Sequence, residues 1–198
     1  MAKAVIFDLN GVFLKADYLS DRIEKEYGIS GNNFWLALKK VLEKTRKPDA
    51  PSFFKLLEPY FKDFNFSISE EEFFNFWFSG EKLVSEVLEY SKSLRYRGIK
   101  VFILSNNFKE RTEHYRKNFK EIFDSVDRAY FSWETGFIKP DKQAYENILN
   151  EHNFKAEECI YFDDSEENIK SAKSLGINAF KYEGLDSVKK IIEQIFNK

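Results

Sequence analysis

The sequence predicts an α/β protein: a parallel sheet of five main strands, covered by helices on both faces, with a helical segment inserted after the first strand. Short apolar runs alternate with stretches of helical periodicity, and this alternation is typical of βαβ units. The chain has 198 residues, of which 43% are apolar and 32% charged. This length and composition suit one sizeable globular domain with an insert, or two small domains.

Five strands are expected, each a short run that is rich in apolar residues. The runs AVIFDL, KVFILSN and CIYFDD are nearly continuous apolar segments that end in polar residues, as in strands that are buried on both faces. The runs RAYFSW and NAFKY complete the set. The five expected strands are residues 4–9, 100–106, 128–133, 159–164 and 178–182.

Helices are expected between these strands. Between Leu83 and Leu94 the apolar side chains recur on one helical face. A second helix should follow Pro140, a residue type that suits a helix's first turn. Ser165 can cap a third helix that ends at Gly176, and residues 188–195 form the last one. Strand and helix thus alternate through the second half of the chain.

The alternation of strands and helices is interrupted after the first strand, where a long aromatic-rich stretch takes the place of a short crossover. The runs NNFWLALKKVLEK and SEEEFFNFWF look helical, and TRKPDAPS between them looks like a loop. We expect residues 15–81 to form a helical cap over the strand ends, and residues 1–14 and 82–198 to form the core. The many Phe side chains of the cap should form its own apolar core, with the alternative that some line a substrate pocket or a partner surface.

Composition argues against several classes of partner. The net charge of −2 and the pI near 5.9 show no basic excess, so no nucleic-acid partner is expected. No apolar run approaches the roughly 18 residues of a membrane helix, and the apolar N-terminal stretch is too short for a signal peptide. A single Cys cannot form an intrachain disulfide, and one Cys with two His predicts neither a zinc site nor a Cys-His nucleophile. A cytoplasmic location is expected, and no oligomeric state is indicated.

Four loops should converge, because the carboxyl ends of parallel strands lie along one edge of a sheet. Each loop carries polar side chains of the kinds that phosphoryl transfer needs: a carboxylate nucleophile, a hydroxyl group, a cation and carboxylates that can bind a metal ion. These residues are Asp8 and Asn10 in the first loop, Ser105 and Asn106 in the second, Lys139 in the third, and Asp163 and Asp164 in the fourth.

The chemistry of these side chains is consistent. A carboxylate such as Asp8 can attack phosphorus and form an acyl phosphate, which divides one difficult step into two. A phosphate dianion would be repelled by Asp8, Asp163 and Asp164, and a hard cation such as Mg²⁺ removes this repulsion. Lys139 adds a fixed positive charge, while Ser105 and backbone amides can hold phosphate oxygens. The residues therefore predict a Mg²⁺-dependent phosphohydrolase acting on a small phosphorylated metabolite.

These residues also resemble the four motifs of the haloacid dehalogenase (HAD) superfamily of phosphohydrolases. The segments ILSNN, FSWETGFIKPDKQAYENIL and IYFDDSEENIKSAKSLGI are similar to sugar-phosphate phosphatases and to the phosphatase domain of soluble epoxide hydrolases. The resemblance covers residues 3–14 and about 82–183. It implies a Rossmann-like, three-layer α/β core with a helical cap inserted after the first motif.

By this resemblance Asp8 is the nucleophile and shares a Mg²⁺ ion with the fourth motif. Asp164 is implied as a direct ligand of the ion, and Asp163 as a second or water-mediated one. The backbone carbonyl of Asn10 is implied as a further ligand. Asn168 would support the metal-binding loop without contacting the ion.

The resemblance also implies a phosphate pocket, and one departure from the family pattern lies beside it. Ser105 and Lys139 would orient and neutralise the phosphate, and Asn106 would help to form the pocket. The family's phosphatases usually have Asp at the position of Asn10, where it protonates the leaving oxygen and then activates water. An amide has no proton to exchange at neutral pH, and such acid–base help is typically worth about 10²- to 10⁴-fold in rate.

Three explanations of Asn10 stay open: a substrate with a good leaving group such as an acyl phosphate or anhydride, a slow or inactive relative that binds a phosphorylated ligand, or an introduced substitution that traps a complex.

Two alternative functions follow. The first is a non-catalytic phosphate-binding or regulatory protein on the same fold, which ligand would stabilise without turnover. The second is a haloacid dehalogenase, which uses an aspartate nucleophile without a metal; the paired Asp163 and Asp164 argue against it.

Overall fold

A computed structural model describes residues 2–196 and confirms the predicted α/β class. The sheet strands are β1 (Ala4–Phe7), β4 (Lys100–Ser105), β5 (Arg128–Phe131), β6 (Cys159–Asp163) and β7 (Asn178–Lys181). They are all parallel, in the order β5-β4-β1-β6-β7. Each strand lies inside its expected range and stops one or two residues early. The polar residues of those runs therefore lie at the carboxyl ends of the strands or just beyond them.

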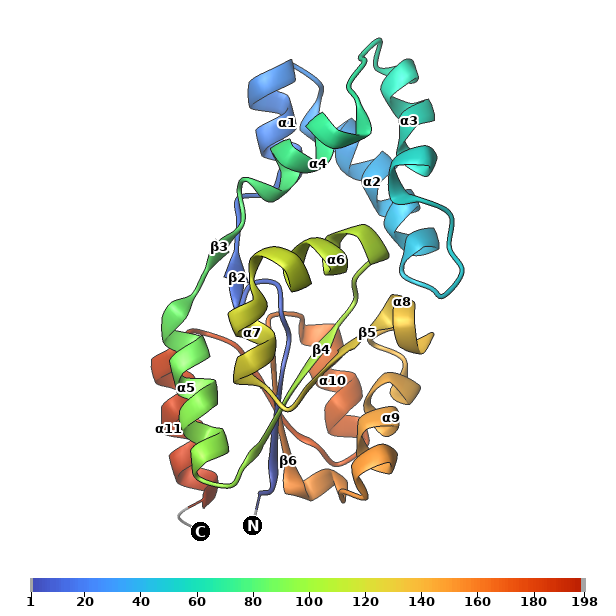
Figure 1. Ribbon diagram of the computed structural model, residues 1–198. Helices are drawn as coiled ribbons and strands as arrows, with labels where there is room; N and C mark the ends of the chain where they lie inside the picture. Colours follow the sequence, from blue (N-terminus) through green and yellow to red (C-terminus); the bar gives the residue numbers. More distant parts are fainter. Residues whose placement is uncertain (1, 197–198) are drawn as a thin grey trace.

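Helices cover both faces of this sheet (Figure 1). They are α5 (Ser85–Tyr96), α6 (Lys109–Asn118), α7 (Lys120–Ser125), α8 (Ser132–Thr135), α9 (Lys142–His152), α10 (Glu166–Ser174) and α11 (Leu185–Phe196), with a 3₁₀ turn at Ala156–Glu158. In β1, Val5 and Phe7 cluster with α5 and α11, whereas Ala4 and Ile6 cluster with α9 and α10. All four side chains are fully buried. This alternation explains why the strand is apolar at every position.

Of the two predicted helix-start signals, the Ser165 cap is observed at α10, whereas Pro140 does not lie in the first turn of α9. Ser165 caps α10, because its hydroxyl oxygen accepts a hydrogen bond from the backbone N–H of Asn168 at 3.4 Å. Pro140, in contrast, lies two residues before α9 rather than in its first turn. The expectation for Pro140 was therefore wrong. Across residues 2–196, no helix has the length and apolar character that crossing a bilayer requires.

The stretch after the first strand forms four helices, which we call the cap helices: α1 (Leu19–Tyr27), α2 (Gly31–Thr45), α3 (Phe53–Asp63) and α4 (Glu70–Phe78). They lie beyond the carboxyl edge of the sheet, at the top of Figure 1. Their apolar side chains form a separate cluster that includes the buried rings of Phe34, Phe61 and Phe73. The aromatic residues thus build a core for this part of the chain.

The cap helices join the rest of the protein through two connections and also contact it directly. The connections are the short antiparallel strands β2 (Leu14–Lys15) and β3 (Lys82–Leu83). The direct contact is made by Phe53, whose ring stacks on that of Phe108 with 4.2 Å between centroids. The backbone N–H of Phe53 also donates to the carboxylate of Glu110 at 2.9 Å. The cap helices are therefore held against the start of α6, beside the carboxyl edge of the sheet.

Candidate active site

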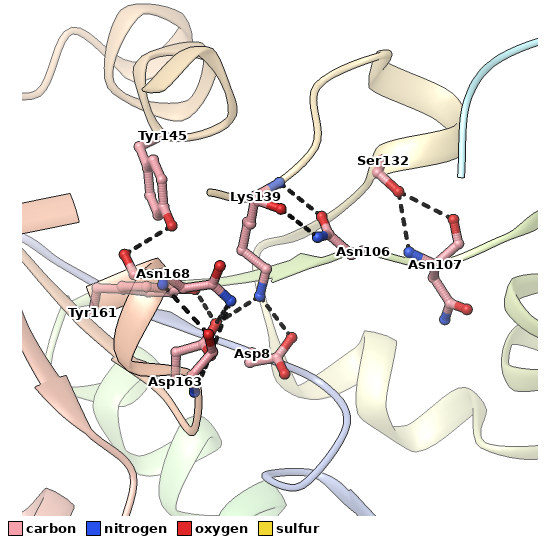
Figure 2. Close-up of polar contacts among 10 residues, drawn as sticks. Asp8, Asn106, Asn107, Ser132, Lys139, Tyr145, Tyr161, Asp163 and Asn168 are labelled. Carbon is pink, nitrogen blue, oxygen red and sulfur yellow. Dashed lines mark hydrogen bonds and ion pairs between the residues drawn. The ribbon is translucent and has the colours of Figure 1, made fainter. Parts of the chain in front are cut away.

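Three charged side chains from three predicted loops meet at the carboxyl edge of the sheet (Figure 2). The ammonium group of Lys139 lies 2.9 Å from Oδ1 of Asp8 and 2.7 Å from Oδ2 of Asp163. All three are buried, with exposed fractions of 4% for Lys139, 9% for Asp8 and 0% for Asp163. Buried charges are costly unless they are paired, so this arrangement depends on all three groups.

Asp164 completes a cluster that can hold a metal ion. Asp8, Asp163 and Asp164 each offer a carboxylate oxygen, and these oxygens lie within 4.8 Å of one another. Gly11 lies against this cluster with φ of +87°, and a Cβ there would approach Oδ2 of Asp164 to 3.3 Å. Three carboxylates, one from the loop after β1 and two from the end of β6, form the all-oxygen donor set that suits a hard divalent cation such as Mg²⁺.

The carboxylate of Asp163 is already fully engaged by protein donors. Its Oδ2 accepts from Lys139, from the side-chain amide of Asn168 at 3.0 Å, and from the hydroxyl of Tyr161. Its Oδ1 accepts from the backbone N–H of Ser165 at 2.8 Å and again from Asn168 at 3.1 Å. Because both oxygens of Asp163 already accept hydrogen bonds, this carboxylate is better suited to holding its loop in place than to binding a metal ion directly. Asp8 and the exposed Asp164 are freer to contact an ion.

The electrostatics of the group favour a bound cation. Burial raises the pKa of Asp8 to about 6, against the opposing effect of Lys139. Burial would also raise the pKa of Asp163, but Lys139 and the hydrogen-bond donors outweigh it and the pKa lies below its usual value. Burial and the neighbouring Asp163 raise the pKa of Asp164. Three carboxylates beside one lysine leave negative charge in excess, which a divalent cation would neutralise.

Two buried polar groups near the end of β4 have no hydrogen-bond partner among residues 2–196. They are the hydroxyl of Ser105 and the side-chain NH₂ of Asn107, each in a residue only 1% exposed. Buried polar groups are rarely left unpaired, because each costs about 1–3 kcal/mol. Ser105 was predicted to bind phosphate, whereas Asn107 was missed although it directly follows SN in the predicted loop. Both groups are available to a ligand's oxygen atoms.

The side chain of Asn106 contributes through Lys139. Its NH₂ donates to the backbone carbonyl of Lys139 at 2.7 Å, and its oxygen accepts from the Lys139 backbone N–H at 2.8 Å (Figure 2). This paired contact ties the loop after β4 to the loop that carries Lys139. Direct contact between Asn106 and phosphate stays a prediction.

Asn10 lies in the same loop as Asp8, but its side chain turns to a tyrosine. Its amide Oδ1 lies 2.9 Å from the hydroxyl of Tyr115 in α6, and that hydroxyl lies 2.9 Å from Oε1 of Glu81. Arg111 pairs with the same oxygen of Glu81. Sequence reasoning missed Tyr115, Glu81 and Arg111, because α6 carries no motif and Glu81 lies at the boundary of the predicted insert.

The end of α2 adds a second cation that was not foreseen. Arg46 is half-buried, and its Nε has no hydrogen-bond partner among the described residues. Burial, together with the like charge of Arg111, lowers the pKa of Arg46, and the opposite charge of Asp8 acts against this. The sequence predicts only a loop for TRKPDAPS, and its composition does not reveal that this segment brings a guanidinium within electrostatic range of Asp8.

Curated relatives resemble parts of this chain. Over 116 residues this chain is 27% identical to bifunctional epoxide hydrolase 2 from Rattus norvegicus. The aligned segment covers 57% of this chain and 21% of the relative. Over 86 residues this chain is 30% identical to a phosphatase from Mycobacterium tuberculosis, which covers 43% of this chain and 40% of that protein. The chain thus spans well under half the length of these two relatives.

Solved structures match over the whole fold. A HAD family enzyme from Bacteroides thetaiotaomicron aligns with a TM-score of 0.80 and 21% identity, over 100% of this chain and 99% of that one. A form of the same enzyme in complex with magnesium and inorganic phosphate aligns with a TM-score of 0.77 and 20% identity, over 92% of this chain and 95% of that one. A HAD phosphatase from Thermococcus onnurineus aligns with a TM-score of 0.65 and 19% identity, over 96% and 97% of the two chains.

The family assignment agrees with the geometry described above. The family model for haloacid dehalogenase-like hydrolases matches residues 2–176, which include Asp8, Ser105, Lys139 and both acids of the fourth loop. The expected family resemblance is confirmed, and this chain belongs to the haloacid dehalogenase-like hydrolase family.

Proposed function

We propose that this hydrolase is a Mg²⁺-dependent phosphatase that acts on a small phosphorylated metabolite through an aspartyl-phosphate on Asp8. The observation that carries the proposal is the meeting of Asp8, Asp163, Asp164 and Lys139 at one edge of the sheet. The similarity to a phosphatase and to a HAD enzyme that binds magnesium and phosphate supports the same reaction class.

The proposed residue roles follow from charge and geometry. Mg²⁺ held by Asp8, Asp164 and the backbone carbonyl of Asn10 would neutralise the negative charge that keeps a phosphate away from these carboxylates. Asp8 attacks phosphorus and forms an O–P bond, while the bond to the leaving oxygen breaks and its electron pair departs with that oxygen. Water then attacks phosphorus, which releases phosphate and regenerates the carboxylate. Lys139 and Ser105 donate to the phosphate oxygens.

Asn10 favours a second candidate, a non-catalytic protein that binds a phosphorylated ligand. Such a protein would gain thermal stability from Mg²⁺ and a phosphate analogue but would release no phosphate. The dehalogenase alternative is less consistent with the clustered carboxylates, which a metal-free reaction does not need. Chloride release from a 2-haloacid would identify it.

Replacing Asn10 with Asp should raise kcat for an alkyl phosphate by at least about tenfold, because the new carboxyl group can protonate the poor leaving group. An acyl phosphate leaves without protonation, so hydrolysis of acetyl phosphate should gain less than hydrolysis of the alkyl ester. The measurement is phosphate release from glycerol phosphate and acetyl phosphate in Mg²⁺, for the wild type and Asn10→Asp.

Asn10→Ala is the matched control for this experiment, since it removes the amide without supplying an acid, and it should not gain activity on the alkyl ester. Mass spectrometry should check that residue 10 is intact, because Asn-Gly pairs deamidate to an acid. If neither the wild type nor Asn10→Asp hydrolyses either substrate, the phosphatase proposal is wrong. Stabilisation by Mg²⁺ and a phosphate analogue without turnover would then support the binding protein.

A further inference from the structure

A buried polar chain leads from Asn10 to the point where the cap helices rejoin the core. The Tyr115 hydroxyl lies 2.9 Å from both the Asn10 amide and Oε1 of Glu81. Arg111 donates to the same Glu81 oxygen from Nε at 2.8 Å and from Nη2 at 2.5 Å. Tyr115 is fully buried and Glu81 nearly so. The described groups thus form a continuous path of four side chains.

The hydrogens in this path can be assigned from simple counting. A phenol carries one proton, so Tyr115 can donate to only one of its two oxygen neighbours. The carboxylate of Glu81, ionised beside Arg111, is a stronger acceptor than a neutral amide oxygen. Tyr115 therefore donates to Glu81, and its own oxygen is left to accept. Asn10 can supply that donor when its amide plane turns by 180°, which exchanges NH₂ and oxygen at the same heavy-atom positions.

The other polar atom of the Asn10 amide, which we call the outward atom, is not the one that contacts Tyr115. Among the described residues it has no hydrogen-bond partner, and it is not one of the buried unpaired atoms, so solvent reaches it. With NH₂ directed to the phenol, this outward atom is the amide oxygen. It belongs to the loop that also carries Asp8, two residues earlier.

The path is also anchored to the cap helices. Glu81 immediately precedes β3, one of the two connections to the core. The guanidinium of Arg111 lies over the ring of Trp77 in α4, 5.2 Å from its centroid, and 5.4 Å from the centroid of Tyr115. A cation above an aromatic face is attracted to it, so the position of α4 helps to set the position of Arg111.

We propose that Tyr115, held by Glu81 and Arg111, is a positioning residue that fixes the Asn10 amide with its NH₂ toward the phenol and its oxygen outward. The outward oxygen accepts a hydrogen bond from the water that attacks the phosphorylated Asp8. The second statement rests on the proposed phosphatase function, whereas the first does not. The surroundings of position 10 therefore suit an amide. An ionised carboxylate there could not accept a hydrogen bond from Tyr115, because the phenol already donates its one proton to Glu81.

The first test measures the amide itself and needs no turnover. In a ¹⁵N-labelled sample, the side-chain NH₂ signal of Asn10 is identified by its loss in Asn10→Ala. It should exchange with solvent slowly in the wild type and at least several-fold faster in Tyr115→Phe. Tyr130→Phe is the matched control, because it removes another buried hydroxyl, one that bonds to His152 at 2.8 Å. It should leave the Asn10 signal unchanged.

The second test measures catalysis with acetyl phosphate and Mg²⁺. Loss of one hydrogen bond predicts that Tyr115→Phe lowers kcat about three- to tenfold. Because Tyr115 acts through Asn10, the double variant with Asn10→Ala should be no slower than Asn10→Ala alone. Tyr130→Phe should leave kcat unchanged. A purely structural role would instead lower the melting temperature while the two substitutions affected kcat additively.

The two tests separate the two claims. An Asn10 NH₂ that exchanges equally fast in the wild type and in Tyr115→Phe would overturn the positioning proposal, whatever the turnover. Slow exchange that depends on Tyr115, in a protein that hydrolyses no phosphate, would retain the positioning of Asn10 and reject the phosphatase function and the water contact. Additive effects on kcat would overturn the catalytic part of the proposal.

Discussion

Replacing Asp8 with Asn is expected to lower kcat for phosphate release by at least about 10³-fold, which corresponds to more than about 4 kcal/mol of lost transition-state stabilisation. An amide of nearly the same shape cannot form the acyl phosphate, so the first step of the reaction is lost. Asp8 also lies 2.9 Å from Lys139. The substitution removes a charge from this contact but leaves Lys139 paired with Asp163. The fold should therefore persist.

Phosphate release and the trapping of a phosphorylated protein by acid quench, followed by mass spectrometry, measure this effect. The wild type should carry phosphate on Asp8, and Asp8→Asn should carry none. Asp21→Asn is a suitable control, because Asp21 is an exposed acid in α1. Retention of more than a tenth of the wild-type kcat by a folded Asp8→Asn variant would contradict the role of Asp8 as nucleophile.

Replacing Lys139 with Met should lower the free energy of unfolding by about 3–5 kcal/mol at pH 7.5, the usual cost of removing one partner from a buried ion pair. Lys139 lies between two buried carboxylates, and no other cationic side chain forms an ion pair with them among the residues that the structure describes. Urea unfolding in EDTA measures this cost without a contribution from Mg²⁺. Phosphatase activity should also be lost, because the phosphate would meet uncompensated carboxylates.

The loss of stability should depend on pH in a defined direction. In the wild type, the lowered pKa of Asp163 stabilises the fold at neutral pH, and this contribution disappears as the pH falls through that pKa. The raised pKa of Lys139 stabilises the fold until the pH rises toward that pKa. Without Lys139 the carboxylates take up protons more readily in the folded state. The deficit of Lys139→Met should therefore be larger at pH 7.5 than at pH 5.

Lys170→Met is the control for this experiment, since Lys170 is an exposed lysine in α10 and its loss should change the free energy of unfolding by less than about 0.5 kcal/mol. Equal free energies of unfolding for Lys139→Met and the wild type at both pH values would contradict the account. They would show that Lys139 does not stabilise the buried carboxylates of Asp8 and Asp163.

The strands and most core helices could be predicted because their signals are local. The run AVIF of β1 is apolar at every position because helices cover both faces of this strand. The ends of these runs then place Asp8 and Asp163 at the same edge without any knowledge of packing. For α6 the sequence predicts only that His114 lies on a surface-like helix, because KERTEHYRKN is dominated by charged and polar residues and lacks an apolar period that would show which face is buried.

The contacts around position 10 could not be predicted because they are long-range. Asn10 and Tyr115 are 105 residues apart, and their contact depends on how α6 packs against the first loop. Arg46 is a similar case, since its charge near Asp8 depends on how α2 sits over the sheet edge. Composition identifies the cap as helical and aromatic, but the direction of each side chain is set by tertiary packing.

The most direct test of the central claim is a crystal structure of the protein with Mg²⁺ and beryllium trifluoride, a mimic of a phosphoryl group on aspartate. We expect the mimic on the carboxylate of Asp8, with Mg²⁺ bound at about 2.0–2.1 Å by oxygens of Asp8 and Asp164 and by the backbone carbonyl of Asn10. An ion that binds away from Asp8, or a mimic that leaves Asp8 unmodified while the protein is folded, would contradict it.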